Sequence, residues 1–382
     1  MPRSRAFLVL AVAIFSSQFA NGINRSIQNN FFVEELHLQA GQMGFLTTAR
    51  EIPGFLTALV AALAAGLAPP HLGSIALLVM GVGYGSYGLV TTFPGLVAVS
   101  MIGSLGFHTW MPINSALGLA LASRENAGQV LGRIQAIGFA GALLAMGLVI
   151  LFISAVGYRI AFFVSGAAIV VGAVAILAYP RNLAKKPKER IVFRRKYWLY
   201  YALTFLDGCR GEVFLAFGVY LLVQQYGVGV ETITALLLVS SVASMFLSAP
   251  IGRLIDRVGE RRALTFSYGC HLIAFLGFAL IQDATAAIVL YTMYNVILLF
   301  SMATNTYLKR TASPEDVGPS LAMGMTTMHV SAMVIPILGG MLWQSYGFQV
   351  PFLVGAGFIV ISLAVTQLIP KRTLIAPTPS AA

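Results

Sequence analysis

Apolar runs long enough to cross a lipid bilayer recur along this whole sequence, and they constrain its fold more than any other feature. A membrane-spanning helix needs about 20 apolar residues. A lipid-exposed backbone must satisfy its own hydrogen bonds, so runs of this length are expected to be helical. We predict twelve spans, with approximate bounds of 6–33, 41–66, 72–91, 94–122, 128–154, 158–179, 197–226, 231–255, 262–282, 285–309, 317–345 and 347–369. The sequence therefore predicts an all-α membrane protein.

The composition supports this class and argues against a soluble one. Of the 382 residues, 58% are hydrophobic and only 10% are charged, whereas a soluble domain carries about a quarter charged residues. The net charge is +11. The basic residues, however, stand in short clusters between apolar runs, which is typical of cytoplasmic loops and not of a nucleic-acid interface. We expect the lipid bilayer as a partner and no nucleic acid.

Charge in the connections predicts how the chain crosses the membrane. The basic residues of alternate connections and of the termini fall on one side, namely Arg3, Arg5, Arg124, the segment 181–196, the segment 253–262, Lys309, Arg310, Lys371 and Arg372. The other side carries Glu34, Glu35, Glu231 and Asp283, with Arg159 as its basic residue. Under the positive-inside rule both termini are cytoplasmic. The short loops favour a bacterial inner membrane.

A basic, proline-containing linker divides the chain into two halves. It covers residues 181–196, so residues 1–180 and 197–382 each hold six predicted spans. The halves look like repeats. Asn21-Gly22 and Asp207-Gly208 lie 186 residues apart, and Gly157-Phe162 and Gly347-Phe352 match at a slightly larger offset. Parallel repeats are one known transporter architecture, with the substrate site between them. We expect two pseudo-symmetric six-helix bundles, complete in a monomer.

Three ionisable residues, Asp207, Arg210 and Glu212, lie in the middle of the seventh predicted span. A charge in hydrocarbon is costly, so such residues face a protein interior or a water-filled cavity and are paired. Asp207 and Arg210 are three residues apart and so share one helical face. This pattern favours a transport pathway. The alternative is a structural ion pair that locks two helices together.

Other polar residues at membrane depth are candidates for substrate binding or coupling. The first span carries Asn21, Asn24 and Arg25, which mirror the charged residues of the seventh. The alternative for each is an ordinary hydrogen bond between helices. The remaining candidates are Arg50 and Glu51 in the second span, His108, Trp110 and Asn114 in the fourth, Tyr294 and Asn295 in the tenth, and His329 in the eleventh.

A loop motif follows the eighth span. It reads Gly252-Arg-Leu-Ile-Asp256-Arg257-Val-Gly259-Glu-Arg261-Arg262 and resembles the G-x-L-x-D-R-x-G-x-R-R signature of the major facilitator superfamily. The resemblance implies a gate that stabilises the outward-facing state. The positive end of the eleventh span could face Asp256, while the arginines bind carboxylates. Alternatively, the arginines only set topology. The first-half counterpart departs from the pattern, with Pro70 and His71 where the acid and arginine would stand.

These features predict a secondary active transporter for a small organic solute that works by alternating access. Arg25 and Arg210 would hold an anionic or amphipathic solute, since guanidinium groups match carboxylate and phosphate. Asp207 and Glu212, with Glu51 and His108 as second choices, would bind the coupling proton.

Three alternatives remain open. One is proton-driven multidrug efflux, although the fifth span lacks the proline of the antiporter signature. Another is a membrane sensor or scaffold without turnover. An integral-membrane enzyme has little support, because the sequence shows no nucleophile elbow, phosphate-binding loop or paired metal-ligand histidines. We expect no cofactor and no metal.

Overall fold

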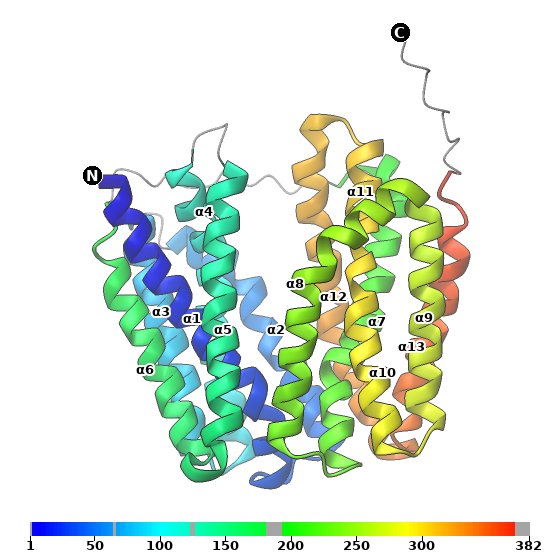
Figure 1. Cartoon of the computed structure of the whole chain (residues 1–382), viewed down its shortest axis with the longest axis horizontal. Coiled ribbons are helices and arrows are strands. Elements are labelled where there is room, and N and C mark those ends of the chain that lie inside the picture. The colour runs from blue at the N-terminus through cyan, green and yellow to red at the C-terminus, as the bar shows by residue number, and fades with distance from the viewer. Residues whose placement is uncertain (1, 64–65, 123–126, 181–192, 371–382) are drawn as a thin grey trace. The chain divides into compact units, whose positions relative to one another are not determined.

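The computed structural model describes residues 2–63, 66–122, 127–180 and 193–370, and all of their regular structure is helical (Figure 1). The α-helices are α1 (Pro2–Glu34), α2 (Ala40–Leu63), α3 (Pro69–Ser86), α4 (Phe93–Leu121), α5 (Ala127–Val156), α6 (Tyr158–Ile176), α7 (Trp198–Gln224), α8 (Val230–Val258), α9 (Glu260–Leu280), α10 (Ala284–Ile297), α11 (Met302–Thr311), α12 (Pro314–Tyr346) and α13 (Gln349–Thr366). Three short 3₁₀ turns accompany them, namely η1 (Tyr87–Leu89), η2 (Arg195–Tyr197) and η3 (Leu298–Ser301).

The predicted all-α membrane fold with twelve spans is confirmed. Ten helices of the described chain are long and apolar enough to cross a membrane, counting 284–311 as one. Helices α2 and α7 are not among them. In α7 every 18-residue stretch contains Asp207, Arg210 and Glu212. The tenth span departs from a single helix. It is broken by η3 just after Asn295, whose side-chain amide bonds the Tyr291 carbonyl at 2.9 Å. Such local bonds compete with the helix ladder and bend helices.

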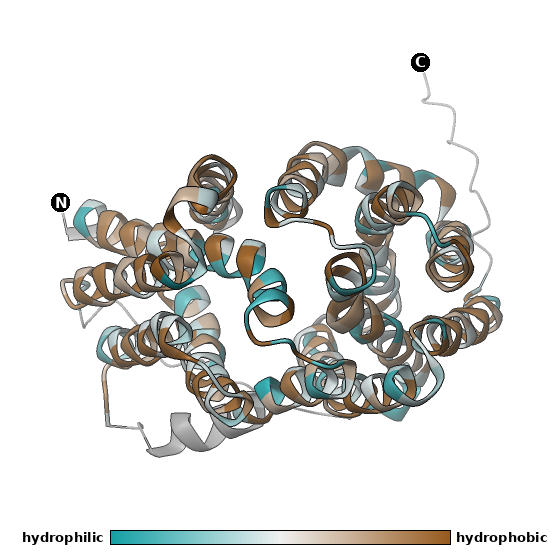
Figure 2. Cartoon of the chain, turned by 90° about the horizontal axis from the view of Figure 1, so that it is seen from below, coloured by the Kyte–Doolittle hydropathy of each residue, from teal (hydrophilic) through white to brown (hydrophobic). Residues whose placement is uncertain are grey.

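Apolar side chains face outward, as expected of a protein surrounded by lipid. Leu151 on α5 and Val174 on α6 are 69% and 63% exposed. Figure 2 shows brown, apolar residues on most turns of the helices, with teal turns between them. A soluble protein rarely presents contiguous apolar patches of this kind, so these faces fit a bilayer.

The described helices belong to two compact units. The first comprises Met1–Glu189, Glu212–Ser241 and Ala332–Pro351. In it α1 packs against α5 and α6, α3 against α4 and α6, and α2 against α4. Small residues allow the close contacts. A Cβ on Gly22 would lie only 2.8 Å from the carbonyl oxygen of Ala142 on α5. Close backbone approach through glycine is typical of helix packing in membranes.

The first unit also contains the C-terminal parts of α7 and α12. Helix α2 packs against α12 there, because a Cβ on Gly44 would clash with the carbonyl of Pro336, and one on Gly340 would lie 2.5 Å from the Ala40 carbonyl oxygen. Tyr220 of α7 donates a hydrogen bond to the Leu38 carbonyl at 2.8 Å. Both glycine contacts leave no room for a side chain.

The second unit comprises Arg190–Gly211, Val242–Ser331 and Phe352–Ala382. Helix α9 packs against α10 and α11 in it. A buried cluster joins the start of α7 to α11 through Tyr197, Tyr200, Tyr201 and Leu308. Most of the predicted linker lies outside the described residues. At its described end, Arg194 and Lys196 form ion pairs with Asp316 at 3.2 and 2.7 Å.

Local geometry repeats where the sequence repeats. Gly157 between α5 and α6 and Gly347 between α12 and α13 have φ values of 78° and 97°. Glycine adopts this left-handed region without the strain that a side chain brings. Phe162 and Phe352, five residues after these glycines, are both fully buried. The same tight turn and the same buried ring therefore recur in the two halves of the sequence.

Candidate functional site

Two adjoining cavities lie in the first unit. The first, which we call the amide cavity, is lined by Gln18, Asn21, Asn114 and Gln135 and has a volume of about 360 Å³. The second, the charged cavity, is lined by residues that include Arg50, Glu51 and His108 and has a volume of about 420 Å³. Gln18, Asn21 and Arg25 line both. Each volume is typical of a small-molecule site, which spans roughly 300–1,000 Å³.

One face of α1 supplies the shared wall. Gln18, Asn21, Arg25 and Gln28 follow one another at spacings of three and four residues, which brings side chains onto the same helical face. Asn24 also lines the charged cavity. Its NH2 group donates hydrogen bonds to the Ala20 carbonyl at 2.9 Å and to the hydroxyl of Ser165 on α6, while its buried Oδ1 has no partner within the described chain.

Arg25 is the exposed cation of this shared wall. Among the residues that the structure describes, its guanidinium makes no hydrogen bond and no ion pair. Arg50 differs, since its Nη1 donates to the Gln28 side-chain oxygen at 3.3 Å. A guanidinium at membrane depth is expected to be paired. Arg25 thus has its bonding capacity free for a carboxylate or phosphate.

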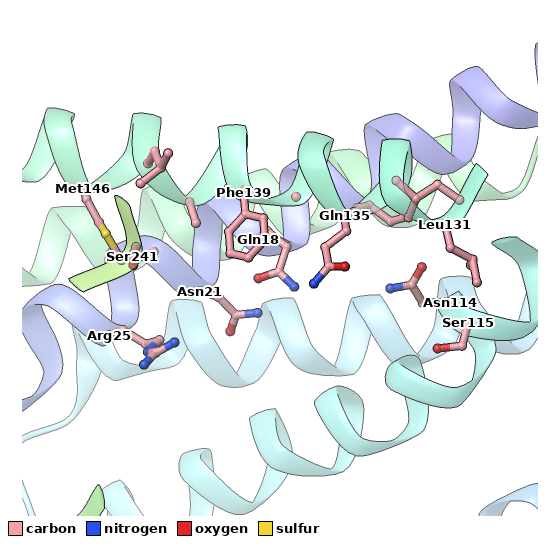
Figure 3. Close-up of a pocket in the computed structure, with 16 residues that line it drawn as sticks. Gln18, Asn21, Arg25, Asn114, Ser115, Leu131, Gln135, Phe139, Met146 and Ser241 are labelled. Atoms are coloured by element: carbon pink, nitrogen blue, oxygen red, sulfur yellow. The ribbon is translucent and has the colours of Figure 1, made fainter. Parts of the chain in front are cut away.

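The amide cavity contains carboxamides that the protein leaves unbonded. Gln18 on α1 and Gln135 on α5 make no side-chain hydrogen bond within the described chain, and the buried Asn114 oxygen on α4 has no partner there. Figure 3 shows the Gln18 and Gln135 amides pointing toward one another, with Asn114 next to them. Asn21 differs, because its oxygen accepts a hydrogen bond from Tyr84 at 3.1 Å. These groups can bond a solute.

The charged cavity brings together the predicted residues of α2 and α4. Arg50 and Glu51 lie on α2 and His108 on α4. The Ser104 hydroxyl of α4 donates to the Arg50 carbonyl, which fixes the two helices together. The ring of His108 lies beside Gly54, where an added Cβ would be 3.3 Å away. The cavity therefore holds acidic, basic and titratable groups at one place.

Trp110 lies elsewhere. It is 3% exposed and packs against Gly73 of α3, where a Cβ would be 3.0 Å from the indole. It is not among the residues that line either cavity. Its position fits a packing role between α3 and α4, while the predicted binding role remains without support from the geometry.

The second unit holds the ion pair of α7. Arg210 Nη2 lies 2.8 Å from Asp207 Oδ1, and the two side chains are 1% and 12% exposed. Arg210 Nη1 donates to the Tyr294 hydroxyl on α10 at 3.1 Å. The Thr304 hydroxyl on α11 lies 3.4 Å from the other Asp207 oxygen. Asp207 is thus held by two partners, and Arg210 is fully enclosed.

Aromatic rings surround Arg210. Its guanidinium carbon lies 5.7 Å from the ring centres of Tyr268 and Tyr294, within the range of a cation–π contact. His271 of α9, also fully buried, lies beside Tyr294 with ring centres 4.6 Å apart and the rings tilted. This enclosure leaves Arg210 little room to bind a solute directly. Asp207 is the more exposed residue of the pair.

The remaining predicted site residues are dispersed. Glu212 lies on the part of α7 that belongs to the first unit. Asn295 bonds the Tyr291 carbonyl, and His329 is partly exposed on α12. None of these three is among the residues that line the two cavities.

The loop motif forms its ion pairs with α11. Arg310 lies 3.1 Å from Asp256 and 2.9 Å from Glu260. Arg261 donates two hydrogen bonds to Gln367 at 2.9 and 3.1 Å. Sequence reasoning proposed the eleventh span as the partner of Asp256, and it overlooked Arg310, although this residue stands at the basic end of the tenth span.

The other motif residues have simpler positions. Gly259 takes a positive φ of 84° at the turn between α8 and α9. Arg257 and Arg262 are exposed, and Gly252 has open space around it. These placements fit a polar turn between two spans.

Sequence reasoning also missed three site residues. Gln18 stands one helical turn before Asn21, and that spacing could have identified it. Gln135 lies beside Arg133, which drew attention as the charged residue. Tyr84 bonds Asn21 from α3, and no local pattern marks it.

The sequence matches a family of membrane transporters when it is compared with known proteins. A sequence model described as the Major Facilitator Superfamily matches residues 10–307. An uncharacterized MFS-type transporter of Methanocaldococcus jannaschii is 26% identical over 129 residues, which cover 34% of this chain and 32% of that protein. The match thus spans about a third of this relative's length.

Solved structures share the fold. The crystal structure of the nucleoside transporter NupG with one substitution superposes with a TM-score of 0.79 and 15% identity, covering 95% of this chain and 99% of that one. The crystal structure of a D-xylose–proton symporter gives a TM-score of 0.73 and 11% identity, covering 96% and 98%. At these identities the likeness concerns the fold alone.

Proposed function

Because the chain belongs to the Major Facilitator Superfamily, we propose that it is a secondary active transporter that carries a small organic anion by alternating access. The single observation that carries this proposal is Arg25. Its exposed guanidinium lines both cavities and has no ion pair or hydrogen bond among the described residues. An anionic group of the solute would supply the missing partner.

The lining of the cavities supports a polar solute over a lipophilic drug. Small-molecule pockets in general are lined mainly by apolar and aromatic side chains with a few polar groups, and the amide cavity has apolar members such as Phe139 and Met146. Here amides, arginines, a glutamate and a histidine gather within two small cavities. The multidrug alternative therefore has less support than the anion.

Coupling to protons is part of the proposal. Asp207 is the first choice for the proton site, because its carboxylate is 12% exposed and is held by Arg210 and Thr304. Movement of α7 against α10 and α11 would change these contacts and so the proton affinity. Glu51 and His108 line the charged cavity and are second choices. We further propose that one chain is the working unit, with both termini in the cytoplasm of a bacterial cell.

The test is transport in proteoliposomes made with the full chain. Radiolabelled organic carboxylates and phosphates are offered with and without an inward proton gradient, for wild type, Arg25→Gln and Arg133→Gln. Arg133 is an exposed arginine of α5 that is not among the cavity-lining residues, so it controls for lost positive charge. We expect gradient-driven uptake of anions that Arg25→Gln abolishes and Arg133→Gln retains.

The alternatives give different results in the same assay. A multidrug transporter would move lipophilic cations and would not need Arg25. A sensor or scaffold would show binding without flux of any labelled compound. Equal anion uptake by Arg25→Gln and wild type would contradict the proposed role of Arg25.

A further inference from the structure

The amide cavity presents hydrogen-bonding groups without partners. The side chains of Gln18 and Gln135 make no hydrogen bond within the described chain, and the Asn114 oxygen is buried without one. Burying an amide without a hydrogen bond is unfavourable. Polar side chains inside membrane proteins normally bond across helices. Of the three groups only the Asn114 oxygen is buried, while Gln18 is partly exposed and Gln135 is exposed. Because they line one cavity from three different helices, all three are available to bond a solute.

Two further side chains beside the three amides line the same cavity. Arg25 closes the other end of the same cavity wall, and Phe139 of α5 lies among the amides with 40% of its surface exposed (Figure 3). A carboxamide both donates and accepts hydrogen bonds. The site thus offers one cationic contact, several paired donors and acceptors, and one aromatic face.

We infer that the transported anion has a hydroxyl-rich body, as in a sugar acid, with its carboxylate at Arg25 and its hydroxyls at Gln18, Gln135 and Asn114. This deepens the proposed function and rests on it. A hydroxyl donates and accepts at one atom, which matches a carboxamide group. The CH groups along such a body can pack on Phe139 as an apolar surface.

The arrangement of the three amides favours a solute with hydroxyl groups over a flat heterocycle. A flat heterocycle has its hydrogen-bond donors and acceptors in one plane. One side-chain amide can bind two of them at once, as Asn and Gln bind adenine. Here the free amides come from three different helices, α1, α4 and α5, and do not form one bidentate edge. Hydroxyls around a saturated ring or chain point in several directions and can meet all three.

The volume of the amide cavity agrees with one bound sugar acid. The amide cavity measures about 360 Å³, near the lower end of the roughly 300–1,000 Å³ of small-molecule sites. A six-carbon sugar acid fits this space, whereas a large amphiphile does not.

The test measures binding of four defined probes to the purified full chain. Gluconate carries both the carboxylate and the hydroxyls, hexanoate only the carboxylate, glucose only the hydroxyls, and nicotinate a carboxylate on a flat heterocycle. We expect gluconate to bind at least about tenfold more tightly than the other three, because hexanoate and nicotinate lose the hydroxyl hydrogen bonds and glucose loses the charged contact to Arg25. This comparison uses the wild-type protein and needs no variant.

Variants then assign the contacts. Gln18→Met and Gln135→Met keep the side-chain length and remove the amide, and each should weaken gluconate binding about two- to tenfold. Gln129→Met, on an exposed position of α5 that is not among the cavity-lining residues, is the matched control and should not. Each variant is checked for its thermal unfolding midpoint before binding is compared.

The outcomes separate this inference from the proposed function. Equal binding of hexanoate and gluconate, both lost in Arg25→Gln, would overturn the hydroxyl-rich body and leave anion transport standing. Tightest binding of nicotinate would overturn it in the same way. Tightest binding of glucose, unaffected by Arg25→Gln, would overturn the anion proposal itself.

Discussion

Arg210 and Asp207 form an ion pair within one turn of α7, with 2.8 Å between the guanidinium and the carboxylate and only 1% of the arginine side chain exposed. The pair is completed by Tyr294 on α10 and Thr304 on α11. It therefore fixes α7 to two neighbouring helices of the second unit, and it also holds the carboxylate proposed to bind the coupling proton.

Replacing Arg210 with methionine should destabilise the protein strongly. Removing one partner of a buried ion pair leaves an uncompensated charge and costs about 3–5 kcal/mol. The thermal unfolding midpoint in detergent should fall accordingly. The double variant Arg210→Met with Asp207→Asn removes both charges and should recover much of the loss. An unchanged midpoint in the single variant would show that the pair does not support the fold.

Asp207→Asn should separate coupling from translocation. The amide keeps the shape of the carboxylate but cannot exchange a proton near neutral pH. Because the substitution also leaves the enclosed Arg210 without its carboxylate partner, the thermal unfolding midpoint is compared first. In the folded variant we expect exchange of labelled for unlabelled solute to continue in proteoliposomes, while accumulation driven by a proton gradient is lost. Glu231→Gln, an exposed carboxylate at the start of α8, serves as the control. Normal accumulation by Asp207→Asn would assign the proton site elsewhere.

The contact between α2 and α12 should be needed for transport. Gly44 lies so close to Pro336 that a side chain cannot fit, so Gly44→Leu should hold the two helices apart. If alternating access requires this contact to form and open, uptake should fall at least about tenfold. Gly147→Leu is the matched control, because nothing lies within 4 Å of a Cβ there. Equal loss in both variants would indicate general damage to folding.

The ion pair between Lys196 and Asp316 should stabilise the protein over the whole neutral range. The pKa of Lys196 is raised, mainly because its ammonium donates a hydrogen bond to Asp316. Stabilisation from a raised lysine pKa is full below the ordinary value of about 10.4 and is lost as the pH rises through the raised value. The melting difference between wild type and Lys196→Gln should therefore be constant from about pH 6 to 9 and shrink at higher pH. A difference that shrinks below pH 9 would contradict this account.

Much of the fold could be predicted because spans of lipid-facing helix leave a strong composition signal. The twelve spans followed from run length alone. The break at η3 could not be predicted, because residues 284–311 contain neither proline nor glycine to mark it. Pairings between distant residues were equally hidden. Arg310 bonds Asp256 and Glu260 across some 50 residues of sequence.

Charge and helical spacing marked five residues that the structure brings together at one cavity. Asn21, Arg25, Arg50, Glu51 and His108 all line the charged cavity, because polar residues at membrane depth collect at protein-lined space. Uncharged amides carry a weaker signal, and Gln18 and Gln135 were overlooked for that reason. Trp110 packs against Gly73 between α3 and α4, and its binding role stays a prediction.

The most direct test of the central claim measures how a carboxylate binds at Arg25. Isothermal titration of gluconate into wild type, Arg25→Lys and Arg25→Gln compares a guanidinium fork, a point charge and no charge. A hydrogen bond to a charged group contributes about 1.5–3 kcal/mol, or roughly a ten- to hundredfold change in Kd. The account predicts a Kd that rises at least about tenfold in Arg25→Gln, with Arg25→Lys between that variant and wild type. Equal Kd values for all three proteins would contradict it.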